Sequence, residues 1–81
     1  MVMQNGFYVI SIKINSTCDL EKYHQLLTEI KGPLFLKNNG KWYDGQDVLA
    51  INNCDFTHRL QLFCQHDDAL KFKKLEYRKV S

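Results

Sequence analysis

The segment from Lys31 to Ile51, KGPLFLKNNGKWYDGQDVLAI, limits the possible fold of this chain more than any other. Within it, the Asn38-Asn39-Gly40 run supplies residues that tolerate positive φ, as a tight hairpin turn requires. We therefore predict a strand around residues 34–36, a turn, and a second short strand around residues 42–43. A short helix is predicted to follow, from Asp47 to about Asn53.

The part of the chain before this segment predicts a strand followed by a helix. Apolar and polar residues alternate from about Phe7 to Ile14, as they do in a strand with one buried face. Ser16 and its neighbours offer side-chain caps for the next helix, whose apolar residues recur at spacings of three and four. Gly32 is expected to end this helix, and Pro33 to prevent its resumption.

The C-terminal part predicts one more strand and one more helix. Alternation from about His58 to Gln65 indicates a fourth strand, and Asp67 and Asp68 are expected to open a final helix. The predicted order is βαββαβα, an α+β fold. The 81 residues suffice for a single domain, residues 1–81, but not for two cores. A hydrophobic content of 44% and a charged content of 25% are typical of a globular protein.

Composition and patterning argue against several classes of protein. No apolar run approaches the roughly 18 residues of a membrane span, so we expect no membrane association. The N-terminus lacks the features of a secretion signal, and the three cysteines form no paired motif. We therefore expect a cytoplasmic protein with reduced thiols. The net charge of +2 is too small to argue for a partner, so we expect no nucleic-acid binding.

The order of elements, the Lys31-Gly32 pair and the runs NNGKWYDGQDVLAI and LQLFCQH resemble the histidine-containing phosphocarrier (HPr) family of the bacterial phosphotransferase system. The resemblance extends from Phe7 to about Val80. It implies an open-faced β-sandwich, in which helices cover one face of a four-stranded antiparallel sheet. It also implies a protein partner, either a phosphotransferase-system component or a transcription regulator.

The chain departs from this family at the phosphocarrier position. Family members carry the phosphorylatable histidine at the start of the first helix, and an arginine two positions later. Counting back from Lys31-Gly32 places Asp19 at that histidine and Glu21 at that arginine. Two carboxylates would repel a phosphoryl group, so we predict that the carrier chemistry is lost. The alternative is a phosphocarrier that uses an unorthodox acceptor, Asp19 or His24.

A second departure lies at the start of the short helix, where Asp47 takes the place of the regulatory serine. Its carboxylate is interpreted either as a partial mimic of phosphoserine or as a helix cap, and the cap alone would explain it. Val48 and Ile51 are expected to point inward. Because partners of the family dock on the outward face of this helix, the predicted partner contacts are Val48, Leu49 and Asn52.

Strand alternation also predicts an apolar surface on the side of the sheet away from the helices. In the spatial strand order of the family (first, fourth, second, third), four outward residues form one band: Val9, Phe63, Phe35 and Trp42. A contiguous apolar band on a small protein usually marks an interface, so we predict a partner-binding surface or a homodimer face. The alternative is that a tail, Met1 to Gly6 or Val80, covers part of it.

Other chemistries find less support in the sequence. RNA binding on sheet aromatics would require interleaved cations, and only Lys13 and Arg59 are expected on the outward face. Two loose Cys-His pairs do not provide the three or four converging ligands of a metal site. No catalytic triad and no Gly-rich phosphate loop can be argued from the spacings, so we expect no enzymatic activity, metal or cofactor.

These observations lead to one principal hypothesis and two alternatives. The principal hypothesis is an HPr-like binding or regulatory module of bacterial carbohydrate control that lacks phosphocarrier chemistry. The alternatives are the phosphocarrier with an unorthodox acceptor and a small structural homodimer that retains only the fold.

Overall fold

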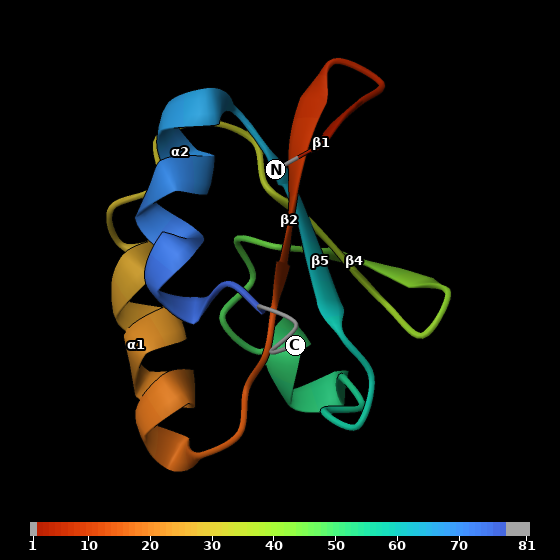
Figure 1. Ribbon diagram of the computed structural model, residues 1–81. Helices are drawn as coiled ribbons and strands as arrows, with labels where there is room; N and C mark the ends of the chain where they lie inside the picture. Colours follow the sequence, from red (N-terminus) through yellow and green to blue (C-terminus); the bar gives the residue numbers. More distant parts are fainter. Residues whose placement is uncertain (1, 78–81) are drawn as a thin grey trace, which may run out of the picture.

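The computed structural model describes residues 2–77 and shows an antiparallel sheet with helices on one side (Figure 1). Five strands lie side by side in the order β1-β2-β5-β3-β4. The strands are β1 (Val2–Gln4), β2 (Phe7–Ile12), β3 (Phe35–Asn38), β4 (Lys41–Asp44) and β5 (Leu60–Cys64). The helices are α1 (Thr17–Leu27), α2 (His66–Lys71) and two 3₁₀-helices, η1 (Ala50–Asn53) and η2 (Phe72–Leu75). The predicted α+β class is confirmed.

The sheet has five strands rather than the predicted four, because the N-terminus forms a hairpin of its own. β1 pairs antiparallel with β2 and places Met3 opposite Tyr8. The turn between these strands is Asn5-Gly6, whose φ angles are 54° and 82°. Two consecutive residues with positive φ make the kind of tight turn that suits the twist of a hairpin. The predicted order βαββαβα therefore lacks this first strand.

The helix α1 ends at Leu27, before the predicted stop at Gly32. Its C-cap is Thr28, whose backbone N–H still bonds to carbonyl groups of the last turn. Gly32 does not adopt a positive φ. Instead, a Cβ atom at this position would lie 2.7 Å from Oε1 of Gln65. Gly32 therefore packs closely against the side chains at the start of α2, and the prediction that it ends the helix is wrong.

A buried carboxylate fixes the same close approach. Asp68 of α2 accepts hydrogen bonds from the backbone N–H groups of Gly32, at 2.9 Å, and Lys31, at 3.3 Å. The ammonium group of Lys71 lies 3.9 Å from the same carboxylate. Because the side chain of Asp68 is buried, these partners are needed to satisfy it. The segment between α1 and β3 is therefore tied to α2.

The predicted short helix is a single turn of 3₁₀-helix, η1, which begins at Ala50 rather than Asp47. Ile51 is buried as expected, but the side chain of Val48 is 54% exposed. The prediction that Val48 points inward is therefore wrong. Val48 lies in the turn before η1, where the helical spacing behind that prediction does not apply.

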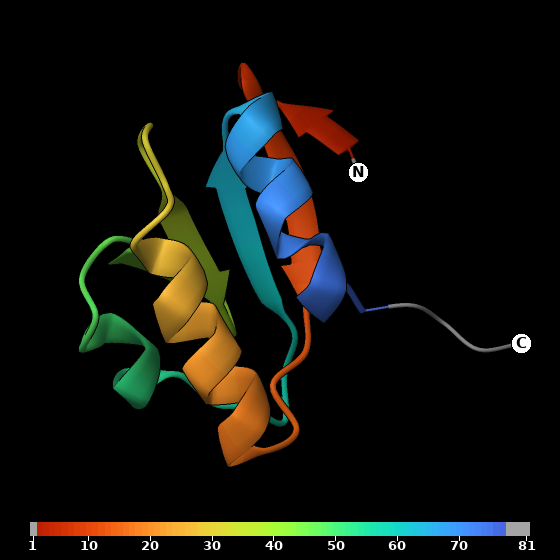
Figure 2. The same ribbon diagram turned by 90° about the vertical axis from the view of Figure 1, so that its left-hand side faces the viewer.

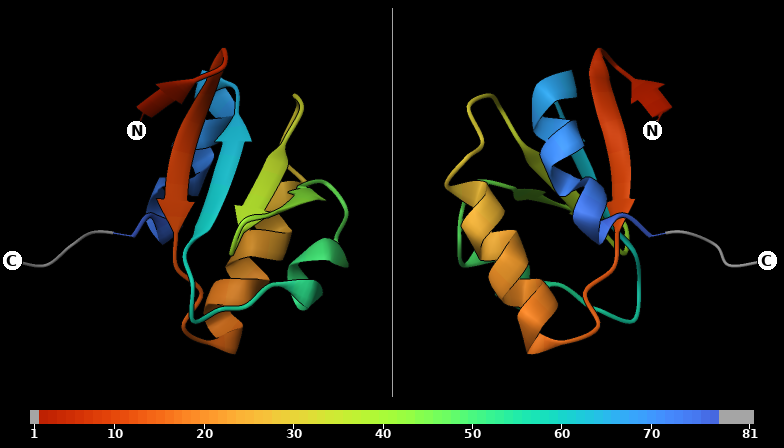
Figure 3. Two further views of the ribbon diagram at one scale, coloured as in Figure 1. Left: turned by 90° about the vertical axis from the view of Figure 1, so that its right-hand side faces the viewer. Right: turned by 60° about the vertical axis from the view of Figure 1, so that its left-hand side comes forward.

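The core lies between the sheet and the helices, which cover only one face of the sheet (Figure 2). The sheet contributes alternate strand residues to this core: Ile10, Ile12, Leu36, Leu60, Leu62 and Cys64. Tyr23 of α1 and Phe72 of η2 pack onto them, with 5.9 Å between their ring centroids. Among the described residues, no helix is long and apolar enough to cross a membrane. The opposite face of the sheet carries no helix (Figure 3, left).

Candidate functional site

The start of α1, where the resemblance places a phosphocarrier histidine, is closed by the side chains of the helix itself. Ser16 is the N-cap residue, and its Oγ accepts a hydrogen bond of 3.2 Å from the backbone N–H of Asp19. The carboxylate of Asp19 in turn accepts one of 3.0 Å from the backbone N–H of Asn15. Asp19 thus supplies a negative charge that stabilises the first turn. The same charge opposes an incoming anion.

The surroundings of Asp19 are of mixed charge. An open groove of about 650 Å³ beside it is lined by Lys13, Asn15, Asp19, Lys73, Lys74, Leu75, Glu76 and Tyr77. Glu21, at the predicted arginine position, is exposed and does not line this groove. The three lysines therefore share the groove with two carboxylates.

His24 does not reach the start of α1. It lies in the C-terminal half of the helix and is half-buried, with its ring centroid 6.0 Å from that of Tyr23. Its Nε2 atom is buried and has no hydrogen-bond partner among the described residues. A buried ring nitrogen is poorly placed to receive a phosphoryl group from another protein.

Asp47 begins the turn that leads into η1. Its side chain accepts a hydrogen bond of 2.9 Å from the backbone N–H of Leu49, and its carbonyl oxygen accepts one of 3.0 Å from Ala50. The carboxylate stabilises this turn, but Asp47 is not the N-cap of η1, since that residue is Leu49 and it has no side-chain cap. The three predicted contact residues Val48, Leu49 and Asn52 are all exposed, and Leu49 is the most exposed apolar residue among them, at 66%.

The predicted apolar band forms one continuous cluster on the open face of the sheet. Val9 lies opposite Phe63, and Phe63 lies opposite Phe35. Trp42 joins the band diagonally, with its ring centroid 4.8 Å from that of Phe63. Phe7 was not predicted to belong to it, yet its ring packs edge-on against Phe35 at 5.5 Å. The alternation of β2 already places Phe7 on the same face as Val9.

The band is not equally exposed along its length. Val9 and Phe63, on the two inner strands, retain only 9% and 5% of their surface. Phe35 and Trp42 are 43% and 57% exposed. The buried members thus support the exposed ones, and Phe35 and Trp42 are the pair that a partner would contact.

No tail among the described residues covers the band. β1 lies at the outer edge of β2 and extends the sheet, whereas Met1 and Val80 lie outside the described residues (Figure 3). A groove of about 450 Å³ beside the band is lined by Pro33, Leu34, Phe35, Trp42, Tyr43, Asp44 and Gln46. The open face is therefore available for contact across its described part.

Cations are interleaved with the aromatic rings more densely than predicted. The Nζ atom of Lys37 lies 5.2 Å from the ring centroid of Trp42. Arg59 and Lys13 approach the ring of Tyr77, with distances of 4.2 Å from Cζ and 5.6 Å from Nζ. The prediction that only Lys13 and Arg59 face outward is therefore wrong. Lys37 alternates with the inward Leu36 just as Phe35 does, and this alternation could have revealed it.

The thiol groups of Cys54 and Cys64 are not activated nucleophiles. Burial, assisted by the nearby Asp68 carboxylate, raises the pKa of the Cys64 thiol to about 11, and burial also raises the pKa of Cys54. A raised pKa keeps a thiol protonated and unreactive at neutral pH. Within the described part of the chain, no three His, Cys, Asp or Glu side chains are grouped so that they could hold a metal ion.

Comparison of the chain with protein-family models, with curated proteins and with solved structures finds no match.

Proposed function

We propose that this protein is an HPr-like binding module that has lost phosphocarrier chemistry and acts in the bacterial cytoplasm on a protein partner. The partner class is a component of the phosphotransferase system or a transcription regulator that it controls. The proposal combines the resemblance in the sequence with the chemistry of two sites, the start of α1 and the turn before η1.

The single observation that carries the proposal is the closed start of α1. The first-turn N–H of Asp19 is taken by Ser16, and the Asp19 carboxylate adds a negative charge there. Free N–H groups and a positive potential are what a helix N-terminus offers to a phosphoryl group. Here a side chain occupies one donor and the Asp19 carboxylate adds a negative charge at the place of the acceptor, so transfer to this site is unfavourable.

Docking is assigned to the turn before η1. Val48 and Leu49 form an exposed apolar pair beside the permanent charge of Asp47. An apolar contact next to a fixed carboxylate provides both affinity and selectivity for a partner with a complementary cation. In this proposal Asp47 caps the turn and holds a charge where relatives acquire one by phosphorylation.

Intact-protein mass spectrometry tests the loss of carrier chemistry. The protein is incubated with phosphoenolpyruvate and Enzyme I, and a genuine HPr serves as the positive control. We expect an unchanged mass for this protein and one added phosphoryl group for the control. An added phosphoryl group that Asp19→Asn or His24→Gln removes would contradict the proposal and establish the unorthodox acceptor.

Titration of Enzyme I against the immobilised protein tests the docking surface. We expect Leu49→Ser to weaken binding at least tenfold, because it removes the centre of the exposed pair. Leu70→Ser on α2 is the matched control, since Leu70 is 41% exposed and lies far from η1 in the fold. Equal losses in the two variants would contradict docking at this turn.

One observation favours a second candidate function, a homodimer formed through the open face. Phe35 and Trp42 expose two aromatic side chains next to each other. Light scattering over a concentration series measures the association directly. The double variant Phe35→Ser, Trp42→Ser should abolish a dimer that uses this face, and a dimer that persists in it must use another.

A further inference from the structure

We propose that the open face of the sheet binds single-stranded nucleic acid, with bases stacked on Phe35 and Trp42 and phosphates held by Lys37, Arg59 and Lys13. This function is separate from the proposed docking at η1 and does not depend on it. It also reverses the expectation, drawn from net charge, that the protein has no nucleic-acid partner.

The proposal rests on the order of side chains along the open face. The first cross-strand row consists of Val9, Phe63 and Phe35 and ends at Asp44, which lies opposite Phe35. The second row consists of Ser11, Gln61 and Lys37 and ends at Trp42, which lies opposite Lys37. Beyond it, Lys13 and Arg59 lie against the ring of Tyr77. The face therefore places cations beside and beyond its aromatic residues, within about 13 Å, the length of four strand residues.

This layout provides the two interactions that single strands require. Exposed aromatic rings stack on bases without regard to sequence, and nearby cations follow the phosphate backbone. Sheets of four strands in RNA-recognition domains stack two or three bases on aromatic residues in this way. Phe35 and Trp42 are exposed; Lys37 follows Phe35 by two positions on the same face of β3, and its Nζ atom lies 5.2 Å from the centroid of the Trp42 ring.

The charges of the face favour this ligand over a second copy of the chain. Among residues 2–77, Lys13, Lys37 and Arg59 form no ion pair with a carboxylate. The one carboxylate in the strand ladder of this face, Asp44, lies opposite Phe35 and accepts a hydrogen bond from the backbone N–H of Gln46. A dimer would have to bury three cations from each copy without partner charges, which is unfavourable. Phosphate groups supply those charges.

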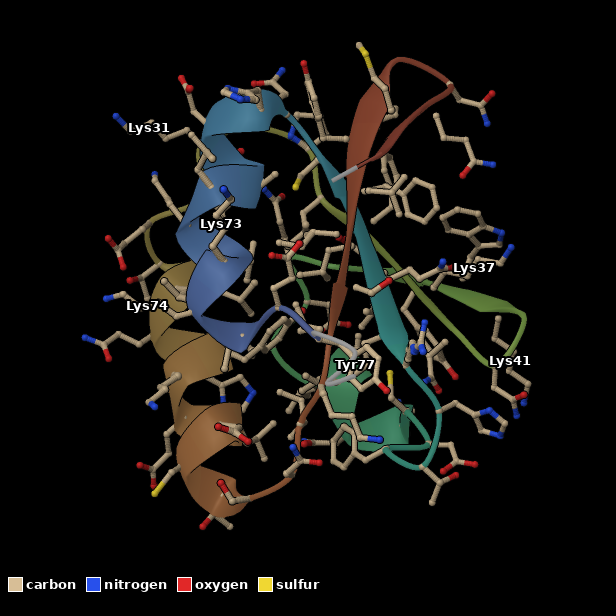
Figure 4. All side chains as sticks on the ribbon, viewed as in Figure 1. Lys31, Lys37, Lys41, Lys73, Lys74 and Tyr77 are labelled. Carbon is tan, nitrogen blue, oxygen red and sulfur yellow. The ribbon has the colours of Figure 1, made fainter. Side chains whose placement is uncertain are left out.

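Lysines lie on both sides of the molecule, and Lys13 lines the groove that also contains Lys73 and Lys74. Lys37 and Lys41 lie on the sheet side of the molecule, whereas Lys31, Lys73 and Lys74 lie on the helix side (Figure 4). This separation allows a matched comparison, because the same number of charges can be removed from either side. Binding that depends only on net charge would respond equally to both changes.

Fluorescence anisotropy with labelled oligonucleotides tests the proposal. The probe is a mixed-sequence single strand of about 12 nucleotides, as RNA and as DNA. We expect the wild-type protein to bind with a dissociation constant of about 10⁻⁶ to 10⁻⁴ M. Emission from Trp42, the only tryptophan of the chain, should change in the same titration. Absence of binding at about 10⁻⁴ M protein would overturn the proposal.

Two triple variants locate the binding surface. The open-face variant K13Q/K37Q/R59Q should bind at least tenfold more weakly. The slope of its log affinity against log salt concentration should be smaller in magnitude by about 2. The helix-side variant K22Q/K31Q/K74Q loses the same charge and should bind within about twofold of the wild type. Circular dichroism establishes that both variants are folded. Equal losses in the two variants would overturn the proposal.

Stacking is tested separately from charge. Trp42→Ala and Phe35→Ala should each weaken binding by roughly 5- to 100-fold, because each removes one stacking platform. A duplex of the same sequence should bind more weakly than the single strand, since its bases are not free to stack. Equal binding of duplex and single strand would overturn the proposal in favour of binding by charge alone. A Trp42 emission that changes only with protein concentration would overturn it in favour of a homodimer.

Discussion

The two faces of the sheet are built from the same strands, yet they differ in what they do. On the face toward the helices, Leu36 and Leu62 are fully buried, and every neighbouring position is apolar or hydrogen-bonded. On the opposite face, one residue further along the same strands, Phe35 is 43% exposed and Lys37 approaches a ring. The helix-covered face thus contributes most of the buried core, whereas the open face combines the buried Val9 and Phe63 with exposed side chains that a partner could contact.

The partners of the polar side chains also differ between the two faces. Asn38 on the core side is buried, and its side chain bonds to the backbone of Asp55 in both directions and to the carbonyl oxygen of Arg59. Among residues 2–77, Lys13, Lys37 and Arg59 lie over aromatic rings and form no ion pair. Core polar groups are thus satisfied within the chain, and those of the open face keep capacity for a ligand.

The largest effect on stability should come from a core residue of the central strand β5. Leu62→Ala is expected to lower the free energy of unfolding by about 2–5 kcal/mol, because it leaves a cavity under both helices. Gln61→Ala, one position away on the open face, should change it by less than about 0.5 kcal/mol. Urea denaturation of the two variants measures the contrast, and similar losses in both would show that the faces do not differ.

A smaller but distinct effect is expected from the buried amide of Asn38. Asn38→Ala should lower the free energy of unfolding by about 2 kcal/mol, because it leaves the backbone N–H and carbonyl groups of Asp55 without their partners. Lys37→Ala is the control on the open face, with an expected change below about 0.5 kcal/mol. An equal loss of unfolding free energy in Lys37→Ala and Asn38→Ala would contradict the difference between the two faces of β3.

The sequence predicted the two faces better than it predicted the ends of the elements. Alternation correctly assigned the inward Leu36 and the outward Phe35, because a strand has a period of two wherever it pairs. The same rule, applied one residue further, would have placed Lys37 outward. The outward position of Lys37 thus follows from the same strand period of two that places Phe35 outward.

The two Asn-Gly turns make the same point about local signals. Asn39-Gly40 was recognised as a hairpin turn, whereas Asn5-Gly6 was not, although both pairs have nearly identical positive φ angles. The strand before Asn5 is only three residues long and supplies little alternation of its own. An Asn-Gly pair near the N-terminus therefore predicts a hairpin turn as well as one between two clear strands does.

Gly32 shows what the sequence alone could not provide. A glycine followed by proline is a usual helix end, so the prediction followed a sound local rule. In the structure Gly32 instead lies next to Gln65 and Asp68, which are more than thirty positions further along the chain. The exposed position of Val48 was also missed, because the predicted helix is reduced to η1 and Val48 lies before it.

Alkaline pH should weaken the helix-covered face through Cys64. Burial raises the pKa of its thiol to about 11 from the 9.0 of an unperturbed thiol, so the unfolded chain loses this proton first. Its contribution to stability is complete below pH 9 and declines as the pH rises toward 11. Burial raises the pKa of Tyr23 as well, which adds to the decline above pH 10.

Urea denaturation at several values of pH between 7 and 11 measures how the free energy of unfolding declines as Cys64 titrates. The change involves one proton and no lost contact. Cys64→Val has a similar volume and no titratable group, so its free energy of unfolding should decline less steeply than that of the wild type. The difference between the two proteins at pH 7 provides the control for packing. Parallel pH profiles would show that Cys64 does not titrate differently in the folded protein.

A small effect on stability is expected at Trp42, which is more exposed than Phe35 on the open face. Trp42 is 57% exposed and contacts Phe63 and Lys37, so Trp42→Ala is expected to lower the free energy of unfolding by less than about 1 kcal/mol. The same change should weaken binding of a single strand far more than it weakens the fold. A large tryptophan kept at small benefit to stability is what a binding surface requires. Thermal unfolding followed by circular dichroism measures the change, and a loss near that of Leu62→Ala would make the open face a second core.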